Sequence, residues 1–570
     1  MIRSEIESII ENVCRELYPE ATARVVLSRT DEQFGDYATN IAMQLAKQIG
    51  RSPKDIAQEI IDALQSNLIA SAELAGPGFI NITLTDSSLV GLAALEIPKL
   101  LTNEKIVIEY SCPNAFKELH TGHLYQTVVG DMLARLLENA GAVVSRTSFG
   151  GDVGLHVARC MWGILGSLGG ENPENLKSIP DSPFDRSAWL SQCYVRGAGV
   201  DTEDNPAHEE IVALNKRIYE LHDKLDKTSD FARIYWQCRQ WSYDYFESFY
   251  DMIGVDEMRY YPESETTGRG MEMVEKQLLA GNLKRSDGAV VFEGDKTKHL
   301  HTRVFVTSAG LPTYETKDIG VILAERSDYA FDRRILITGN DQKEYMRVVF
   351  AAMEQFVPEL KGKMTHLTNG TVRFGDGSKM SSRLGNVSRA IDVLSAVRSK
   401  VLSVVEQSED ATLIDQVTLG AIKYEFAKYR LGGDISFDID ESVSLHGNSG
   451  PYLQYAYARA RSILRKSPQS FDNVLFEDAV KASGLEPAER SLLRKISEYS
   501  EVTGKSASEL MPHYICTYLY ELAQDFNRFY EHNRVIDHER QNIRLLLVDR
   551  YTTVLKSGLE ILGIHAPEKM

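Results

Sequence analysis

Two histidines, His120 and His123, stand three residues apart in the stretch SCPNAFKELHTGH, directly after the apolar run KIVIEY. Such a pair could hold a metal ion, donate hydrogen bonds to a phosphate group or cap a polar turn. A metal ion needs a further ligand, and neither an acidic residue nor a cysteine stands at a usual ligand spacing. Gly122 also interrupts helical geometry between the two rings. We therefore expect no metal site here.

The phosphate interpretation rests on where the stretch lies in the chain. It stands between a predicted buried strand and the predicted helix LYQTVVGDMLARLLENAGA, and parallel sheets bind ligands at such strand-to-helix turns. The helix N-terminus offers free N–H groups and a positive dipole end to an anion, and Gly122 lets a nucleotide approach the backbone. His120 and His123 would then donate to phosphate oxygens as charge develops. The simpler alternative is a polar turn that both histidines cap.

A second stretch, DGSKMSSRLGN, is a Gly- and Ser-rich loop that carries Lys379 and Arg383. Alone, it predicts no more than a flexible basic turn on the surface. In this order and at this separation, however, the two stretches together indicate one phosphate-handling site.

The elements that must position these residues form four predicted units. Helical periodicity and the strand GPGFINITLT indicate a small α+β domain over residues 1–100. A strand, a glycine turn, a helix and the strand VVSRTSFGGDVG form a βαβ unit, so residues 101–386 predict a doubly wound, Rossmann-like parallel sheet. Within it, residues 167–210 are rich in Gly, Pro and Asp without a clear period, and we expect an insertion packed on the surface. Residues 387–445 predict a helical connector and residues 446–570 an all-helical domain, which makes the fold class multidomain α/β.

Length and composition exclude several classes of protein. The 570 residues are too many for one core, no apolar run approaches the roughly 20 residues that span a bilayer, and the N-terminal stretch lacks the features of a signal peptide. Six scattered cysteines without a C-x-x-C pair favour a reducing cytoplasm over a disulfide framework or a structural zinc. The formal net charge of −18 opposes nucleic-acid binding. Binding requires only one basic face, however, and residues 446–570 balance 16 basic against 16 acidic residues.

The two stretches resemble the two signature sequences of class I aminoacyl-tRNA synthetases, with HTGH as the first and KMSSR as the second. More narrowly, the chain resembles the arginyl-tRNA synthetases nearly from end to end, apart from residues 167–210. The likeness is carried by FGDYATNIAMQLAK, GPGFINITL, EYSCPNAFKELHTGHL, GNSGPYLQYAYARARSILRK, YLYELAQDFNRFYEHNRV and GLEILGIHAPEKM. It implies ATP-dependent attachment of L-arginine to tRNA(Arg) through arginyl-adenylate, by a cytoplasmic monomer whose activation step usually requires bound tRNA. Mg²⁺ would arrive with ATP.

The resemblance assigns an ATP site to the two signatures. The implied ATP-binding residues are His120, Gly122, His123, Lys379, Met380 and Ser381. Both histidines and Lys379 would have catalytic roles. Ser382 stands where the family usually has lysine, which weakens the clamp expected on pyrophosphate. Members with a degraded second signature carry a lysine just upstream of the first, where this chain has Lys117. We expect Lys117 to share the phosphate charge; the alternative is a solvated loop lysine.

Arginine as substrate demands carboxylates, because its planar guanidinium is permanently charged and carries five donors. Tyr314 and Asp318 match the family's residues for the guanidinium end, and Glu109 and Asn114 match those for the amino and carboxylate ends. From spacing alone, a tyrosine and an aspartate at i and i+4 merely share one face of a helix. The implied arginine site consists of Glu109, Ser111, Asn114, Tyr314, Asp318 and Gln342.

Two regions are expected to contact tRNA. The helix GPYLQYAYARARSILRK combines tyrosines with basic residues and contains no acid. Aromatic stacking beside phosphate-binding cations suits single-stranded loops, and Tyr455, Arg459 and Arg461 are our candidates; an ordinary helix with core tyrosines is the alternative. By resemblance, Phe79 and Asn81 contact the D-loop of the tRNA.

Two other functions fit the same residues less fully. A cysteinyl-tRNA synthetase is opposed by the absence of zinc-type cysteines. A small cytidylyltransferase on the same fold is opposed by the long helical C-terminal part, which such enzymes lack. A tRNA-binding paralogue that has lost catalysis is favoured only by Ser382.

Overall fold

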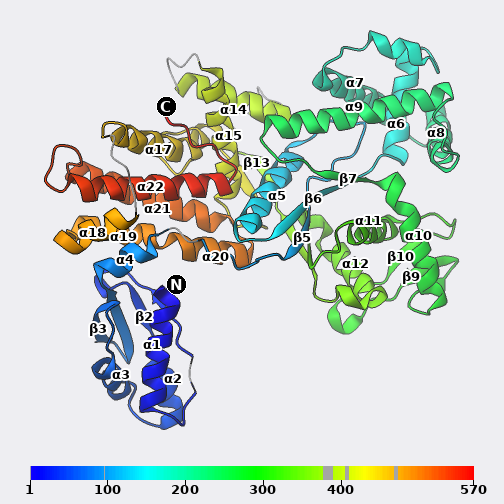
Figure 1. Ribbon diagram of the computed structural model, residues 1–570. Coiled ribbons are helices and arrows are strands. Elements are labelled where there is room, and N and C mark those ends of the chain that lie inside the picture. The colour runs from blue at the N-terminus through cyan, green and yellow to red at the C-terminus, as the bar shows by residue number, and fades with distance from the viewer. Residues whose placement is uncertain (1, 23, 95–96, 376–388, 405–409, 468–472) are drawn as a thin grey trace.

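The computed structural model describes residues 2–22, 24–94, 97–375, 389–404, 410–467 and 473–570. Figure 1 shows an N-terminal unit, a central sheet with its helices and a C-terminal group of helices. The predicted multidomain α/β fold class is confirmed by these three parts. Within the described ranges, no helix is long and apolar enough to cross a membrane.

The N-terminal unit is an antiparallel sheet with helices packed on it. The strands β1 (Ser28–Arg29), β2 (Tyr37–Thr39), β3 (Ile69–Ala75) and β4 (Phe79–Leu84) run in the order β1-β2-β4-β3. The helices are α1 (Ile2–Leu17), α2 (Ile41–Ile49) and α3 (Pro53–Ala63), and the short η1 (Glu32–Phe34) joins β1 to β2. Alternate residues of β4 are buried, as the period of two predicts. Helix α4 (Asp86–Leu92) leads from this unit to the C-terminal helices (Figure 1).

The central sheet has five parallel strands in the order β12-β11-β5-β6-β7. They are β5 (Lys105–Glu109), β6 (Val143–Gly150), β7 (Arg259–Pro262), β11 (Arg333–Gly339) and β12 (Met364–Asn369). Helices α5 (Thr121–Asn139), α10 (Glu263–Leu279), α11 (Tyr314–Tyr329) and α12 (Lys343–Phe356) follow or connect these strands. The chain leaves β5 toward β6 and later returns on the other side of β5 with β11. Ligands of such sheets bind at this reversal, outside the carboxyl ends of β5 and β11.

Alternate residues of β5 belong to two different cores. Ile106 and Ile108 pack in the large core that the sheet shares with α5 and the C-terminal helices, whereas Val107 packs in the core around α12. A strand buried on both faces explains the continuous apolar run that marked this segment in the sequence.

Residues 167–210, in which we expected no regular period, are largely helical. Between β6 and β7 lie α6 (Leu155–Leu168), η2 (Pro173–Ser178), α7 (Pro183–Val200), α8 (Pro206–Asp223) and α9 (Asp230–Met252). Pro173, Pro183 and Pro206 stand at first helical turns, where the missing N–H is harmless. Gly197 of α7 lies at the contact with α6, since a Cβ there would meet the Arg159 carbonyl oxygen at 2.0 Å. Closely packed helices thus occupy most of a stretch in which the sequence showed no clear period.

A small antiparallel sheet and a helical C-terminal part complete the chain. Strands β8 (Lys284–Ser286), β9 (Ala289–Phe292) and β10 (Arg303–Val306) lie between α10 and α11, together with the short helix η3 (Lys296–Lys298). The short helices η4 (Asn340–Gln342) and η5 (Pro358–Leu360) stand before and after α12. Strand β13 (Val372–Phe374) pairs in parallel with β14 (Ile435–Phe437), so the predicted helical connector also contributes a strand. The C-terminal helices are α14 (Ala390–Val404), α15 (Ala411–Ala427), α16 (Ile439–Ser442), α17 (Gly450–Leu464), α18 (Asn473–Ser483), α19 (Pro487–Ser497), α20 (Tyr499–Glu509), α21 (His513–His532) and α22 (Gln541–Ile561).

Candidate active site

The loop between β5 and α5 carries the first signature and is held by hydroxyl groups of α9. Ser111, Cys112 and Phe116 have φ values of 68°, 49° and 66°, a region that costs a non-glycine residue on the order of 1–3 kcal/mol. Ser242 accepts a hydrogen bond from the Phe116 N–H at 2.9 Å, and Tyr250 bonds to the Ser111 hydroxyl at 2.7 Å. Ser111, expected in the arginine site, is thus buried and bonded to the protein. The strained loop is fixed from outside, which pre-organises it.

His120 and His123 lie together at the N-terminus of α5. His120 is the N-cap: its Nδ1 accepts from the His123 N–H at 3.2 Å, and the His123 Nδ1 accepts from the His120 N–H at 3.2 Å. The two rings stack with centroids 3.6 Å apart. Burial and then the charges of His120 and Lys117 lower the pKa of His123 to about 3, and burial and Lys117 also lower the pKa of His120. Both rings are therefore neutral at pH 7 and carry their proton on Nε2.

Lys117 lies among histidines and against an aromatic ring. Its Nζ is 4.0 Å from the centroid of the Tyr194 ring, and its charge contributes to lowering the pKa of His156 to about 4, after burial. Tyr194 belongs to α7, and so does Ser191, which accepts from the Glu118 N–H at 2.9 Å. Helix α7, from the region that the sequence left unassigned, thus supports the first signature directly.

The second signature falls outside the described residues. Lys379, Met380, Ser381, Ser382 and Arg383 all belong to the range 376–388, which the structure does not describe. The chain that follows pairs with the first signature: Arg389 forms an antiparallel bridge with His120, and the Ala390 N–H donates to the Leu119 carbonyl at 2.8 Å. Arg389 and Ala390, the first residues described after this range, therefore lie against the first signature.

Carboxylates gather behind the first signature, around the ends of β5 and β11. Glu109 binds the guanidinium of Arg334, whose Nε donates to Glu325 at 2.5 Å. Asp318 accepts a hydrogen bond from the Tyr345 hydroxyl. We call Glu109, Asp318, Glu325, Arg334 and Tyr345 the pocket network. The sequence singled out only its first two members; an arginine inside the buried strand RRILITG was the available signal for a third.

Burial dominates the electrostatics of the pocket network. Burial raises the pKa of Asp318 to about 6, against the opposing effects of the Tyr345 hydroxyl and the Arg334 charge. Burial and the neighbouring charge of Glu325 also raise the pKa of Glu109, although Arg334 opposes the shift. Three carboxylates share one guanidinium here, so the network lacks positive charge. A cation that enters would be stabilised.

The remaining arginine-site candidates lie more openly around these carboxylates. Tyr314 is 72% exposed at the start of α11, one helical turn before Asp318, and Gln342 is exposed in η4. Asn114 is exposed and its Oδ1 accepts from the Gly151 N–H at 3.0 Å. A Cβ on Gly151 would lie 2.7 Å from that oxygen. Gly151, directly after β6, therefore leaves the space that the Asn114 side chain occupies.

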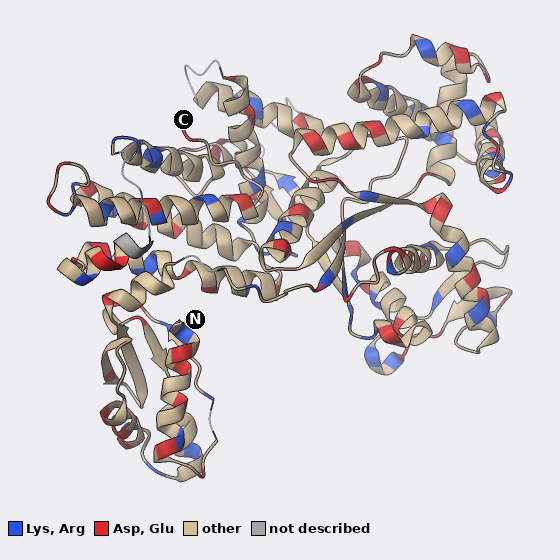
Figure 2. Ribbon diagram, viewed as in Figure 1, with Lys and Arg blue, Asp and Glu red and all other residues tan. Residues whose placement is uncertain are grey.

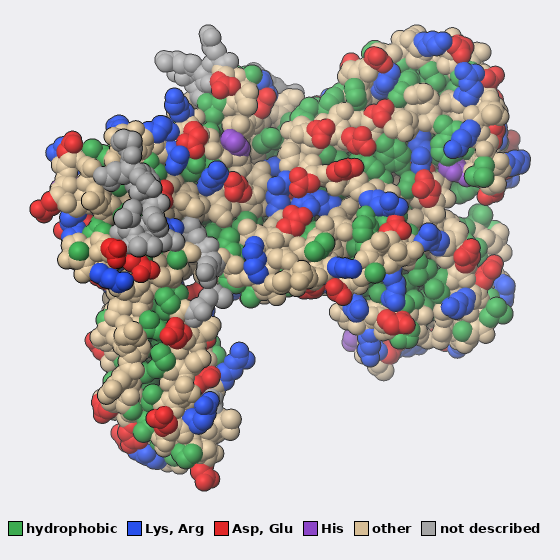
Figure 3. All heavy atoms as spheres, viewed as in Figure 1, with side chains coloured by type: hydrophobic (Ala, Val, Ile, Leu, Met, Phe, Trp, Pro, Cys, Tyr) green, Lys and Arg blue, Asp and Glu red, His purple; other side chains and the backbone are tan. Residues whose placement is uncertain are grey.

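The residues expected to contact tRNA are partly exposed and partly engaged. Phe79 is 39% exposed and Tyr455 is 40% exposed. Asn81 lines a cavity of about 460 Å³ between the N-terminal unit and α19. Arg459 stacks on the Tyr530 ring at 5.0 Å, and Arg461 pairs with Glu568 at 2.9 Å. Basic and acidic residues are interspersed along the ribbon of the C-terminal helices (Figure 2), and their side chains are mixed over the face in Figure 3.

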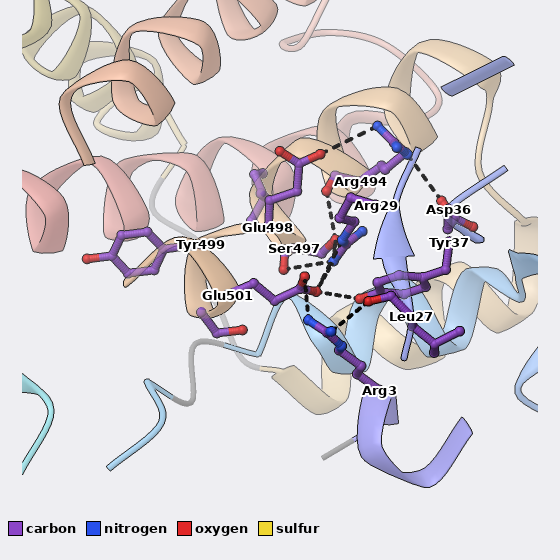
Figure 4. Close-up of polar contacts among 12 residues, drawn as sticks. Arg3, Leu27, Arg29, Asp36, Tyr37, Arg494, Ser497, Glu498, Tyr499 and Glu501 are labelled. Atoms are coloured by element: carbon purple, nitrogen blue, oxygen red, sulfur yellow. Dashed lines mark hydrogen bonds and ion pairs between the residues drawn. The ribbon is translucent and has the colours of Figure 1, made fainter. Parts of the chain in front are cut away.

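Ionic contacts hold the N-terminal unit against the C-terminal helices (Figure 4). Glu501 of α20 pairs with Arg29 at 2.9 Å and with Arg3 at 3.1 Å, and it accepts from the Tyr37 hydroxyl at 2.5 Å. Buried Asp36 pairs with two arginines of α19, the nearer at 2.8 Å. These residues form what we call the junction network: Arg3, Arg29, Asp36, Tyr37, Arg490, Arg494 and Glu501.

Among the described residues, no group of three or more His, Cys, Asp or Glu side chains is arranged to hold a metal ion.

The chain matches three family descriptions in sequence order. They are the arginyl tRNA synthetase N-terminal domain over residues 2–84, the class I (R) tRNA synthetase catalytic domain over residues 89–438 and the DALR anticodon-binding domain over residues 453–570. The catalytic match includes residues 167–210, which the resemblance left out.

Named relatives and solved structures agree with these matches. Arginine–tRNA ligases of Synechococcus sp. and Thermobifida fusca are 31% and 32% identical, over 96% and 94% of both chains. An arginyl-tRNA synthetase structure from Thermus thermophilus superposes with a TM-score of 0.79 at 24% identity over 100% of both chains. One from Plasmodium falciparum has a TM-score of 0.79 at 20% identity, over 100% of this chain and 99% of that chain. At these identities the two structures show a shared fold.

Proposed function

The chain belongs to the arginyl-tRNA synthetase family and uses ATP to attach arginine to tRNA in translation, and we propose how its residues divide that reaction. In the first step, the arginine carboxylate attacks the α-phosphorus of ATP, and pyrophosphate leaves as arginyl-adenylate forms. In the second step, the terminal ribose 2′-hydroxyl of tRNA attacks the adenylate carbonyl, and AMP leaves. Both steps need positioning and charge stabilisation more than covalent help from the protein.

His120 and His123 bind the ATP phosphates and stabilise the charge that develops during adenylate formation. Since each Nδ1 accepts a backbone N–H, each Nε2–H is the donor that can meet a phosphate oxygen. Lys117 adds a full positive charge beside them. Lys379 and its neighbours in the second signature clamp the leaving pyrophosphate. Gly122 allows the nucleotide close approach, because a side chain there would meet the His120 ring at 2.9 Å.

Asp318 binds the substrate's guanidinium, and Tyr314 and Gln342 lie beside this guanidinium. Asp318 is the half-buried carboxylate of the pocket network, reached past the exposed Tyr314. Glu109 and Asn114 hold the amino and carboxylate ends. Lysine cannot make the forked contact that a guanidinium makes with a carboxylate, so the site discriminates by geometry as well as charge.

The N-terminal unit and the C-terminal helices bind tRNA(Arg) on either side of the junction network. Phe79 and Asn81 contact the D-loop, and the helix with Tyr455, Arg459 and Arg461 contacts single-stranded bases. Mg²⁺ enters with ATP and needs no cage of protein ligands. The protein acts as a monomer in the cytoplasm, which its six unpaired cysteines suit.

One observation carries this assignment: two neutral, donor-bearing histidines at a helix N-terminus adjoin a buried set of carboxylates at the reversal point of a parallel sheet. The test is arginine-dependent ATP–pyrophosphate exchange, run with and without total tRNA. We expect exchange that requires both arginine and tRNA. Silence under both conditions, with tRNA still bound, would favour the non-catalytic paralogue and direct attention to Ser382.

A further inference from the structure

Two buried arginines flank the central strand β5, one on each side. Arg334 of β11 stands in register with Val107, and Arg146 of β6 stands in register with Ile108. Arg334 is 1% exposed and Arg146 is 9% exposed. Buried guanidinium groups are rare unless ionic partners surround them, so the partners of each arginine indicate what it does.

The partners of the two arginines differ in kind. Arg146 pairs with Glu138 at 2.5 Å and with Asp256 at 3.1 Å, both away from the proposed substrate pocket. Arg334 binds Glu109, the proposed substrate carboxylate, and Glu325, which is fully buried. Each guanidinium has one buried donor without a hydrogen-bond partner among the described residues, Nη1 in Arg334 and Nε in Arg146, so the difference lies in the carboxylates that each arginine binds. Arg334, fixed between Glu109 and Glu325, is placed to govern their charge.

Every charged group that faces the carboxylates bears on this balance. Arg334 is the positive charge that opposes the upward pKa shifts of Glu109 and Asp318. Glu325, Glu315 and Glu263 act in the opposite direction, while the Tyr345 hydroxyl and the Cys112 thiol donate hydrogen bonds to the carboxylates. His366 of β12 also faces Arg334, and burial with that charge lowers its pKa to about 4. Arg334 is therefore the cation that favours the ionised form of Glu109 and Asp318 against the effect of burial.

We propose that Arg334 is a positioning residue for amino-acid activation and sets the charge that the substrate meets. Its guanidinium holds Glu109 and Glu325 in place, and it leaves Asp318 as the negative charge that receives the guanidinium of the incoming arginine. The inference rests on the proposed role of Asp318 and Glu109. A merely structural ion pair would stabilise the sheet and leave the amino-acid specificity unchanged.

The test compares Arg334→Gln and Arg334→Lys with the matched control Arg146→Gln, which also removes a buried strand guanidinium. ATP–pyrophosphate exchange with saturating ATP and tRNA gives kcat and the arginine KM between pH 5.5 and 8.5. The competitor is citrulline, a neutral isostere of arginine. In the wild type, we expect kcat/KM for arginine to rise with pH as Asp318 ionises, because burial raises the pKa of Asp318 to about 6. Burial lowers the pKa of His123 to about 3, so this limb is not due to His123.

We expect Arg334→Gln to raise the arginine KM by about tenfold or more with a smaller change in kcat. It should move the acid limb about one to three pH units upward, because an opposite charge has been removed. The preference for arginine over citrulline should fall. Arg334→Lys should return the acid limb to its wild-type pH, because lysine keeps the positive charge. Its arginine KM should stay above the wild-type value. Arg146→Gln should lower the melting temperature and leave the limb and the arginine KM within about twofold of wild type.

Folded Arg334→Gln with the wild-type KM and limb would overturn the proposal, as would an equal shift in Arg146→Gln. If Arg334→Gln fails to fold, Arg334→Lys decides in the same assay: an arginine KM and a preference over citrulline equal to those of the wild type would overturn the proposal, because lysine keeps the charge but not the forked contacts to Glu109 and Glu325. Failure of the proposed function itself is distinct: the wild type would then show no arginine-dependent exchange.

Discussion

The pocket network and the junction network use the same chemistry, arginine against carboxylate, in two different settings. In the pocket network one guanidinium pairs with Glu109 and Glu325 and acts electrostatically on a third carboxylate, Asp318, and this guanidinium is almost fully buried. In the junction network four arginines meet Asp36 and Glu501 across two units, and three of these arginines also pair with Glu7, Asp86 or Glu498. The Arg29, Arg3 and Glu501 side chains are 17%, 33% and 22% exposed. The pocket network is buried and short of positive charge, whereas the junction network is partly exposed and divides its charges among several partners.

This difference determines what each network can do. Buried carboxylates that lack a balancing positive charge bind a cation. Removing one charged side chain from such a network is strongly destabilising, because its partner stays buried and unpaired. A junction whose arginines have several carboxylate partners tolerates the loss of one contact, and water screens the exposed pairs. Substitutions in the pocket network should therefore change the arginine KM and kcat/KM strongly, whereas substitutions in the junction network should change tRNA binding only slightly.

The largest effect is expected from Asp318→Ala. It removes the carboxylate proposed to bind the substrate's guanidinium, and kcat/KM for arginine should fall more than about a hundredfold. Exchange kinetics at saturating ATP and tRNA measure it, with the tRNA dissociation constant as the control. Unchanged activation kinetics would remove Asp318 from the pocket.

His120→Asn tests the ATP-binding side of the active site. Asparagine can still cap α5 but has lost the imidazole donor, so adenylate formation should slow by about a hundredfold. Single-turnover formation of adenylate measures the rate, and circular dichroism checks that the helix is intact. If His120→Asn forms adenylate at the wild-type rate, His120 serves only as the N-cap of α5.

Lys117→Ala should have a smaller effect, about tenfold on adenylate formation, because other cations share the phosphate charge. Tyr194→Phe is the matched control, since it keeps the ring under the lysine. If the adenylation rate of Lys117→Ala equals that of wild type, the lysine is an ordinary solvated side chain.

Glu501→Gln should have the smallest effect. It leaves Arg3 and Arg29 without a charged partner on α20, and the tRNA KM should rise about threefold to fivefold. Steady-state aminoacylation over a range of tRNA concentrations measures it. An arginine KM that rises instead would contradict the separation of the two networks.

Sequence reasoning reached the parts of the site that adjoin one another in the chain. The strand, the strained turn and the capped helix around His120 follow from residues 105–139, where apolar runs, Gly122 and the histidines are close neighbours. Arg334 could not be paired with Glu109 in this way, because 225 positions separate them and only the strand order β11-β5 brings them together. The junction network is even less local, since Arg29 and Glu501 are 472 positions apart.

The helices within residues 167–210 were not predicted, for a different reason. Glycine and proline favour loops on average, yet here Gly197 lies at a helix contact and Pro183 and Pro206 stand at first helical turns. The tertiary contact between α6 and α7 explains them, and composition carries no record of such a contact. As a result, the support that Ser191 and Tyr194 give to the first signature was missed.

The most direct test of the account measures the arginine KM and the tRNA dissociation constant of Arg334→Gln and Glu501→Gln side by side. The account predicts opposite patterns: Arg334→Gln raises the arginine KM about tenfold and leaves tRNA binding unchanged, whereas Glu501→Gln weakens tRNA binding about threefold and leaves the arginine KM unchanged. Equal shifts of both constants in both variants would contradict it, because the two networks would then act only through overall stability.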